Sequence, residues 1–173
     1  MPEVVIIAGP NGAGKTTFAR EYLKTSRANM VFVNADEIAR ELTDQGLTRE
    51  QLDVRAARNM IQRISDLADA DAEFMFETTL ATLAYAQKIP LWRRARYSVT
   101  LIYLRLPSVE DSLARVRRRV EAGGHGIPEE TIRRRFDKSM SYFERTYKSI
   151  VDEWYIWDSV DGGFALAQSW DKG

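Results

Sequence analysis

The sequence of 173 residues contains no cysteine, a single histidine and no excess of either charge. Without cysteine the chain can form no disulfide, no thiolate metal site and no cysteine nucleophile. The absence of cysteine also suits a reducing compartment. Lys and Arg number 25, and Asp and Glu number 25, so the composition predicts no general attraction to nucleic acid or to a membrane surface.

Long apolar runs are lacking as well. No run reaches the length that crosses a membrane, and the chain begins directly with a segment typical of a core strand. We therefore expect neither a secretory signal nor a membrane anchor, and we expect a cytoplasmic location. With 45% hydrophobic residues and no low-complexity linker, the chain is predicted to form one domain over residues 1–173.

One glycine-rich stretch fits the pattern G-x-x-x-x-G-K-S/T, with a β-branched apolar segment before it and a helix-like segment after it. In this context the pattern indicates a phosphate-binding loop (P-loop), although a glycine loop that fits by chance is the alternative. The glycines let backbone N–H groups turn inward, and the helix N-terminus adds partial positive charge. We predict that ATP binds to Gly9, Pro10, Asn11, Gly12, Ala13, Gly14, Lys15, Thr16 and Thr17.

Two side chains of this loop carry the predicted chemistry. Lys15 is expected to reach the β- and γ-phosphates and to act in catalysis. The Thr16 hydroxyl is expected to complete the ligand shell of Mg²⁺, so the predicted cofactors are ATP and Mg²⁺.

An acidic residue follows the second predicted strand, residues 30–33, at the edge where ligands bind to parallel sheets. This residue, Asp36, could accept a proton from a substrate hydroxyl as the catalytic base, contact the substrate, or hold Mg²⁺ through water. The alternative is that Asn34 or Asp36 caps a helix beginning at Glu37. We favour the catalytic role for Asp36.

A second acid follows the third predicted strand, residues 74–76. Glu77 and Thr79 are expected to contact the acceptor substrate at the same edge of the sheet. Alternatively, Glu77 supports Mg²⁺ indirectly, by bonding to a group that itself binds the ion. Either Thr78 or Thr79 could also serve as an ordinary helix cap.

Arginines are dense between residues 115 and 135, on two predicted helices. The segment 123–128, Gly-Gly-His-Gly-Ile-Pro, separates these helices, because glycines end a helix and proline suits a first helical turn. We predict a lid over about residues 108–136 that closes on the triphosphate and brings arginines to the transferring phosphoryl group. The alternative is a pair of surface helices with solvated arginines.

Alternation of strand-like and helix-like segments predicts an α/β fold, a three-layer P-loop NTPase sandwich of the nucleotide-kinase type. Its sheet is expected to be mainly parallel and five-stranded, from residues 4–8, 30–33, 74–76, 99–104 and 154–157. Residues 164–170 are a candidate for a final edge strand. Pro90 is expected to kink or to split the helix over residues 83–96.

Four motifs together resemble the zeta-toxin family, and in particular its small single-domain bacterial branch. They are residues 9–17, the Val-Asn-Ala-Asp of 33–36, the Phe-Glu-Thr-Thr of 76–79, and residues 123–128 followed by Arg133, Arg134, Arg135 and Phe136. The resemblance implies ATP-dependent phosphorylation of the 3′-hydroxyl of UDP-N-acetylglucosamine. Ala81 stands where the studied toxins carry an arginine.

The resemblance also implies roles for single residues. Lys15 would hold the phosphates, Asp36 would be the base, and Arg119 and Arg135 would stabilise the transferred group. Glu77 and Thr79 would contact the sugar substrate. A nucleotide sugar is thus the implied small-molecule partner, and an antitoxin is the implied protein partner.

Two other functions compete with a kinase. A nucleotide-gated module, or an ATPase, could capture a protein partner such as an antitoxin without phosphorylating a small molecule. Nucleic-acid binding through the arginines ranks last, because the chain is neutral and no aromatic residues interleave the arginine runs.

Overall fold

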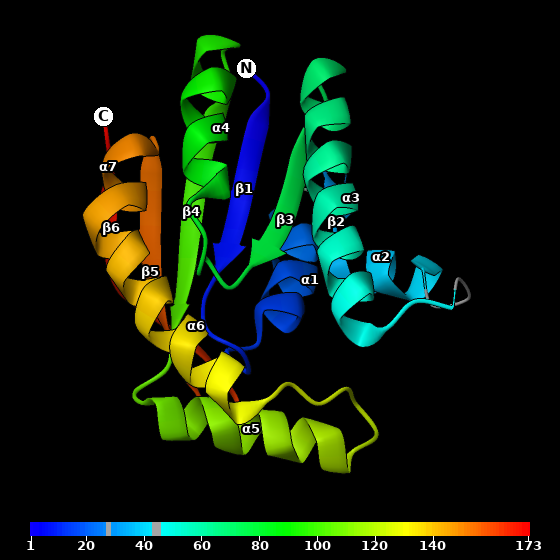
Figure 1. Ribbon diagram of the computed structural model, residues 1–173. Helices are drawn as coiled ribbons and strands as arrows, with labels where there is room; N and C mark the ends of the chain where they lie inside the picture. Colours follow the sequence, from blue (N-terminus) through cyan, green and yellow to red (C-terminus); the bar gives the residue numbers. More distant parts are fainter. Residues whose placement is uncertain (27–28, 43–45) are drawn as a thin grey trace.

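The computed structural model describes residues 1–26, 29–42 and 46–173, apart from the side chains of Ser26, Asp36 and Arg49. It shows a central sheet between helices (Figure 1). The strands are β1 (Glu3–Ala8), β2 (Val31–Val33), β3 (Phe74–Thr78), β4 (Ser98–Arg105), β5 (Glu153–Val160) and β6 (Gly163–Asp171). The helices are α1 (Lys15–Ser26), α2 (Ala35–Leu42), α3 (Arg49–Asp69), α4 (Ala84–Arg94), α5 (Val109–Glu121), α6 (Glu129–Tyr142), the π-helix η2 (Phe143–Tyr147) and α7 (Lys148–Ile150).

The sheet has the strand order β2-β3-β1-β4-β5-β6. The first five strands are parallel, and β6 runs antiparallel to β5. The predicted α/β sandwich with a mainly parallel sheet is confirmed. The sheet has six strands instead of five, since the candidate edge segment does form β6. The carboxyl ends of the five parallel strands meet at one edge of the sheet, where ligands bind in such folds.

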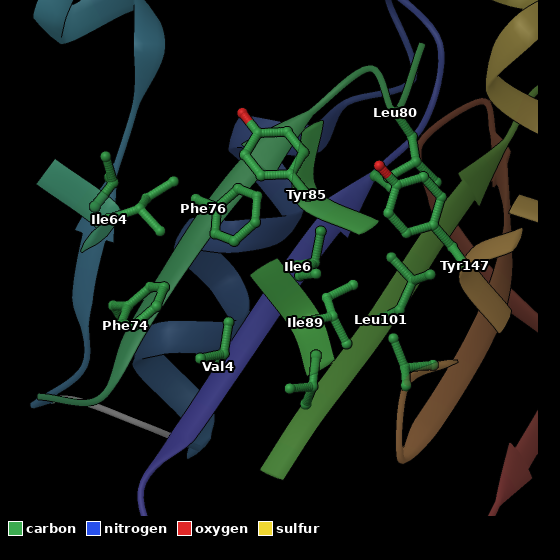
Figure 2. Packing of buried hydrophobic residues seen from close by; sticks show 14 of the residues in the cluster. Val4, Ile6, Ile64, Phe74, Phe76, Leu80, Tyr85, Ile89, Leu101 and Tyr147 are labelled. Carbon is green, nitrogen blue, oxygen red and sulfur yellow. The ribbon is translucent and has the colours of Figure 1, made fainter. Parts of the chain in front are cut away.

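Alternate residues of the central strands pack into two separate hydrophobic clusters. Val4 and Ile6 of β1 belong to a large cluster with residues of α3, α4 and η2 (Figure 2). Val5 and Ile7 belong to a smaller cluster on the opposite face, which α1 covers. Strands buried on both faces appear in a sequence as continuous apolar runs, which is why these strands were predictable.

The structure corrects one helix start and decides two points of helix continuity. Helix α2 begins at Ala35 instead of Glu37, so Asn34 directly precedes it, and the backbone N–H of Ile38 donates to the Asn34 carbonyl at 3.2 Å. Pro90 lies within a single helix, α4, and does not split it. The helix after residue 128 passes from α6 into η2 and then into α7. Among the helices of the described residues, none has the length and apolar character that a bilayer crossing requires.

Candidate functional site

The glycine loop connects β1 to α1 at the carboxyl edge of the sheet. Inside the loop, the Ala13 N–H donates to the Pro10 carbonyl at 3.2 Å, and α1 begins directly at Lys15. Gly12 has a backbone φ of +80° and lies against α5: a Cβ there would be 2.9 Å from the Cβ of Arg115. Glycine is therefore required at position 12 both by its backbone angle and by the closeness of α5.

Lys15 folds back over this loop. Its Nζ donates to the Gly9 carbonyl at 3.1 Å and to the Pro10 carbonyl at 3.0 Å. The ammonium group is thus held at the mouth of the loop, next to the N-terminus of α1. A turn of backbone N–H groups, a lysine and a helix N-terminus form a set of donors that fits the oxygens of a phosphate group.

Thr16 and Glu77 form the most direct contact between predicted site residues. The Thr16 hydroxyl donates to Glu77 Oε2 at 2.8 Å. The contact follows from the topology, because β1 and β3 are parallel neighbours and Ile7 pairs with Glu77. A hydroxyl and a carboxylate at the phosphate loop are ligand types that suit Mg²⁺.

The oxygen-rich character of this corner also fits the manner in which Mg²⁺ binds. In the described part of the chain, no three His, Cys, Asp or Glu side chains gather into a metal cage. Mg²⁺ in nucleotide sites usually takes only one or two protein ligands, together with phosphate oxygens and water. The pair of Thr16 and Glu77 fits that number of protein ligands.

Asp36, the predicted base, lies in the first turn of α2, just beyond the carboxyl end of β2. Its side chain is outside the described residues, so its role stays a prediction. Thr79, the second predicted acceptor contact, is half-buried in the segment between β3 and α4. Thr78 shapes the start of that segment, since its Oγ1 accepts the Leu80 N–H at 3.0 Å.

Helix α5 holds the phosphate loop from outside. Ser112 Oγ donates to the Asn11 carbonyl at 2.5 Å, and Arg115 donates to the Gly12 carbonyl at 3.4 Å. The Arg115 guanidinium also donates to Ser159 Oγ at 2.8 Å, which ties the loop to the end of β5. The first half of the predicted lid is therefore packed against the loop that it was expected to cover.

The roles of Ser112, Arg115 and Ser159 were not found by sequence reasoning. A serine inside a helix and an arginine in an arginine-rich segment each have an ordinary explanation. The contacts join residues 101, 103 and 44 positions apart in the chain, and no local pattern indicates them.

Helix α5 ends as predicted at the paired glycines. The Gly124 N–H donates to the Arg119 carbonyl at 2.8 Å, and the Gly123 N–H donates to the Val120 carbonyl at 2.9 Å. Gly123 has a φ of +92°, which completes the helix-ending turn known as the Schellman motif. Arg119 is exposed in the last turn of α5. The only histidine, His125, is also exposed in the connecting segment.

The arginines of α6 differ in their environments. Arg133 is exposed and bonds to Glu129 at 2.8 Å and to Glu110 at 3.2 Å, so it belongs to a surface ion pair. Arg135 is half-buried, and burial lowers the pKa of its guanidinium group while the carboxylate of Asp53 on α3 opposes that shift. A half-buried guanidinium facing the rest of the molecule suits contact with an anion better than Arg133 does.

The structure thus brings three predicted residues together, Lys15, Thr16 and Glu77, at one corner of the sheet edge. Arg119 and Arg135 lie on the two helices that were expected to carry them, and the described hydrogen bonds do not join either to the loop. The donors at this corner fit the oxygens of a phosphate group.

Comparison with known proteins gives a family match. The model of the AAA_33 family, described as an AAA domain, matches residues 4–146, which is more than half of the chain. An uncharacterized protein of Haemophilus influenzae is 28% identical over 134 residues, which are 78% of this chain and 92% of that protein.

Solved structures share the fold at low sequence identity. The structure from the PezAT chromosomal toxin-antitoxin system of Streptococcus pneumoniae has a TM-score of 0.66 and 19% identity, and covers 98% of this chain and 72% of its own. The structure of AvrRxo1-ORF1:-ORF2 with ATP has a TM-score of 0.74 and 17% identity, over 98% of this chain and 58% of its own. These likenesses show a kinase-like P-loop fold, and this chain spans little more than half of the AvrRxo1 chain.

Proposed function

Because this chain belongs to the AAA_33 family of AAA domains, we propose that it is an ATP- and Mg²⁺-dependent phosphotransferase acting on a hydroxyl group of a small molecule. One observation carries the proposal: Thr16 at the phosphate loop donates to Glu77 at the end of the neighbouring strand, at 2.8 Å. This pairing prepares a metal site directly beside the lysine that binds phosphate.

Three residues would prepare the phosphoryl donor. Lys15 would exchange its two loop carbonyls for phosphate oxygens of ATP, which are stronger partners because they carry charge. Thr16 would keep its proton toward Glu77, and its lone pairs would be available to the cation. A Mg²⁺ ion held there would neutralise charge on the phosphates.

The transfer itself would need a base and a source of positive charge. Asp36 would take the proton of the acceptor hydroxyl, because it follows β2 at the ligand-binding edge. Arg135, half-buried on α6, and Arg119, at the end of α5, would stabilise the charge that develops on the transferred group.

The acceptor we propose is a nucleotide sugar of the UDP-amino sugar class. Its support is the resemblance to zeta toxins in the four sequence motifs, together with a fold shared with the PezAT structure. Glu77 and Thr79 would contact the sugar in that case. Ala81, in place of the arginine of the studied toxins, would leave more room and less charge beside the acceptor.

A second candidate is a nucleotide-gated module or ATPase with a protein partner. The similar AvrRxo1 structure is a complex of ORF1 with ORF2, and the similar PezAT structure comes from a toxin-antitoxin system. This candidate predicts capture of a partner protein in the presence of ATP, with no phosphorylated small molecule.

The test is a phosphotransfer assay with γ-labelled ATP over a panel of nucleotide sugars, nucleosides and aminoglycosides. We expect labelled product from a UDP-amino sugar, and a 10²- to 10⁴-fold lower turnover for Asp36→Asn with unchanged ATP affinity. Asp66→Asn, an exposed acid on α3, is the matched control and should behave like the wild type. Unchanged turnover in Asp36→Asn would remove the base assignment. Absence of product from every acceptor would favour the second candidate.

A further inference from the structure

Helix α6 links the arginine region to the hydrophobic core. It carries Arg135 in its second turn and continues without a break through the π-helix η2 into α7 (Figure 1). The two ends of η2, Phe143 and Tyr147, are fully buried. A π-turn inside a helix is rare and is often found at functional sites. Arg135 and Tyr147 therefore lie on one continuous run of helix.

Tyr147 joins this helix to the segment that follows Glu77. Its hydroxyl donates to the Thr82 carbonyl at 2.6 Å, and burial raises its pKa while the backbone N–H of Ala86 opposes that rise. Thr82 belongs to the acceptor segment, the name used below for residues 79–83 between β3 and α4. Leu80 belongs to the acceptor segment, and Figure 2 shows it in the same buried cluster as Tyr147.

The acceptor segment is held at its other end by the nucleotide site. Leu80 is fully buried with a φ of +59°, and its N–H bonds to Thr78 Oγ1. The Thr78 carbonyl accepts the N–H of Gly9, the first residue of the phosphate loop, at 3.3 Å. Thr79 therefore lies between Thr78, which bonds to the phosphate loop, and Thr82, which bonds to Tyr147 at the end of the helix that carries Arg135.

We infer that Tyr147 is a positioning residue that couples α6 to the acceptor segment. When Arg135 engages a bound triphosphate, the hydrogen bond from the Tyr147 hydroxyl fixes the Thr82 carbonyl in place. The position of Thr79 in the same segment is set in this way. The inference rests on the proposed function, because it assigns acceptor binding to residues 79–83. A purely structural role for the Tyr147 hydroxyl would give stability but no response to nucleotide.

The experiment compares Tyr147→Phe with Tyr103→Phe. Tyr103 is an equally buried tyrosine whose hydroxyl bonds to Ser139 of α6 at 2.8 Å instead of to the acceptor segment. Each variant loses one buried hydroxyl and keeps its ring. Amide hydrogen exchange of residues 79–83 is measured by mass spectrometry with and without a non-hydrolysable ATP analogue, after its affinity is measured by titration.

We expect the analogue to slow exchange of residues 79–83 about 10-fold in the wild type and in Tyr103→Phe. In Tyr147→Phe the analogue should still bind, but that slowing should be lost. Arg135→Ala, at the other end of the helix, should lose it as well, and this variant decides the question if Tyr147→Phe does not fold. An equal response to the analogue in all variants, or no response in the wild type, would overturn the inference.

A kinetic measurement separates this inference from the proposed function. For an acceptor that the wild type phosphorylates, Tyr147→Phe should raise the KM of the acceptor 5- to 10-fold and leave the KM of ATP unchanged. If no acceptor is phosphorylated by the wild type, the proposed function fails, and the exchange measurement still decides whether Tyr147 couples the two segments.

Discussion

Thr16 has one hydroxyl proton, and the structure shows which group receives it. Because the proton goes to Glu77 Oε2, the lone pairs of the Thr16 oxygen are directed elsewhere and can bind a cation. Glu77 is thus placed to act through Thr16, whereas the resemblance to zeta toxins assigns it to the sugar. A single substitution distinguishes the two roles.

Glu77→Gln keeps the shape of the side chain but removes its charge. If Glu77 supports the metal site, the affinity for ATP in the presence of Mg²⁺ should fall 10- to 100-fold, because groups behind a metal ligand typically contribute that much. The affinity for ATP without Mg²⁺ should not change. Titration of ATP with and without Mg²⁺ measures both values. A variant with normal Mg²⁺ dependence but a raised KM for the acceptor would assign Glu77 to the substrate instead.

The arginines of α6 provide a matched comparison of single residues. Arg135→Ala should lower turnover by roughly two to three powers of ten with a much smaller loss of ATP affinity, since its charge serves the transition state. Arg119→Ala should behave similarly, and the double variant should be non-additive if both arginines act on one group. Arg133→Ala should change little, because Arg133 belongs to an exposed ion pair with Glu129 and Glu110.

The decisive measurement for these variants is turnover beside ATP titration. If Arg135→Ala loses ATP binding and turnover in equal measure, Arg135 only anchors the ground state. If Arg133→Ala loses as much turnover as Arg135→Ala, the distinction between half-buried and exposed arginines on α6 has no functional meaning.

At the scale of elements, β4 and β5 are joined at their carboxyl ends by a two-bond ion pair. Arg105 Nε lies 2.6 Å from Asp158 Oδ1, and the second guanidinium nitrogen lies 3.0 Å from Oδ2. The two residues are direct partners in the parallel register. The hydrogen bonds from Arg105 lower the pKa of Asp158.

This lowered pKa predicts a pH-dependent stability. A carboxyl group whose pKa is lower in the folded state stabilises the fold above its unfolded pKa of about 3.9 and loses that effect as the pH falls through the folded value. Asp158→Asn should reduce the free energy of unfolding at pH 7 by at most about 1 kcal/mol, because the pair is partly exposed. The difference should shrink as the pH falls below about 4.

Urea denaturation from pH 7 to pH 2 measures this difference. Arg105→Ala and the double variant complete a cycle that isolates the pair. A difference between Asp158→Asn and the wild type that stays constant down to pH 2 would show that Asp158 stabilises the strands by packing and not by charge.

Most elements could be predicted from the sequence because their signals are local. The parallel strands are apolar runs between turns, and the end of α5 follows from Gly123, which takes a backbone angle that other residues avoid. The π-turn at Phe143 was not predictable, since its apolar spacing is the same as that of an α-helix. The antiparallel pairing of β6 follows from the short turn at residues 161–162, where the sequence also predicts a turn, because it returns the chain beside β5.

At the scale of the whole molecule, the candidate site divides into a predictable part and an unpredictable part. Lys15, Thr16 and Glu77 could be placed together from sequence, because the carboxyl ends of parallel strands meet at one edge. The support of the loop by Ser112 and Arg115 could not, since it depends on how α5 packs on residues about 100 positions earlier. Helix packing of this kind is decided by the shape of both surfaces, which a local pattern does not contain.

The external support of the phosphate loop has a consequence for synthesis on the ribosome. The residues that touch Asn11, Gly12 and Gly14 from outside include Ser112, Arg115 and the ring of Phe164, which lies 3.0 Å from where a Cβ on Gly14 would be. At roughly 5–20 residues per second, about 7–30 s pass between translation of the loop and translation of β6. A growing chain therefore carries its nucleotide motif before the residues of α5 and β6 that contact the motif have been translated.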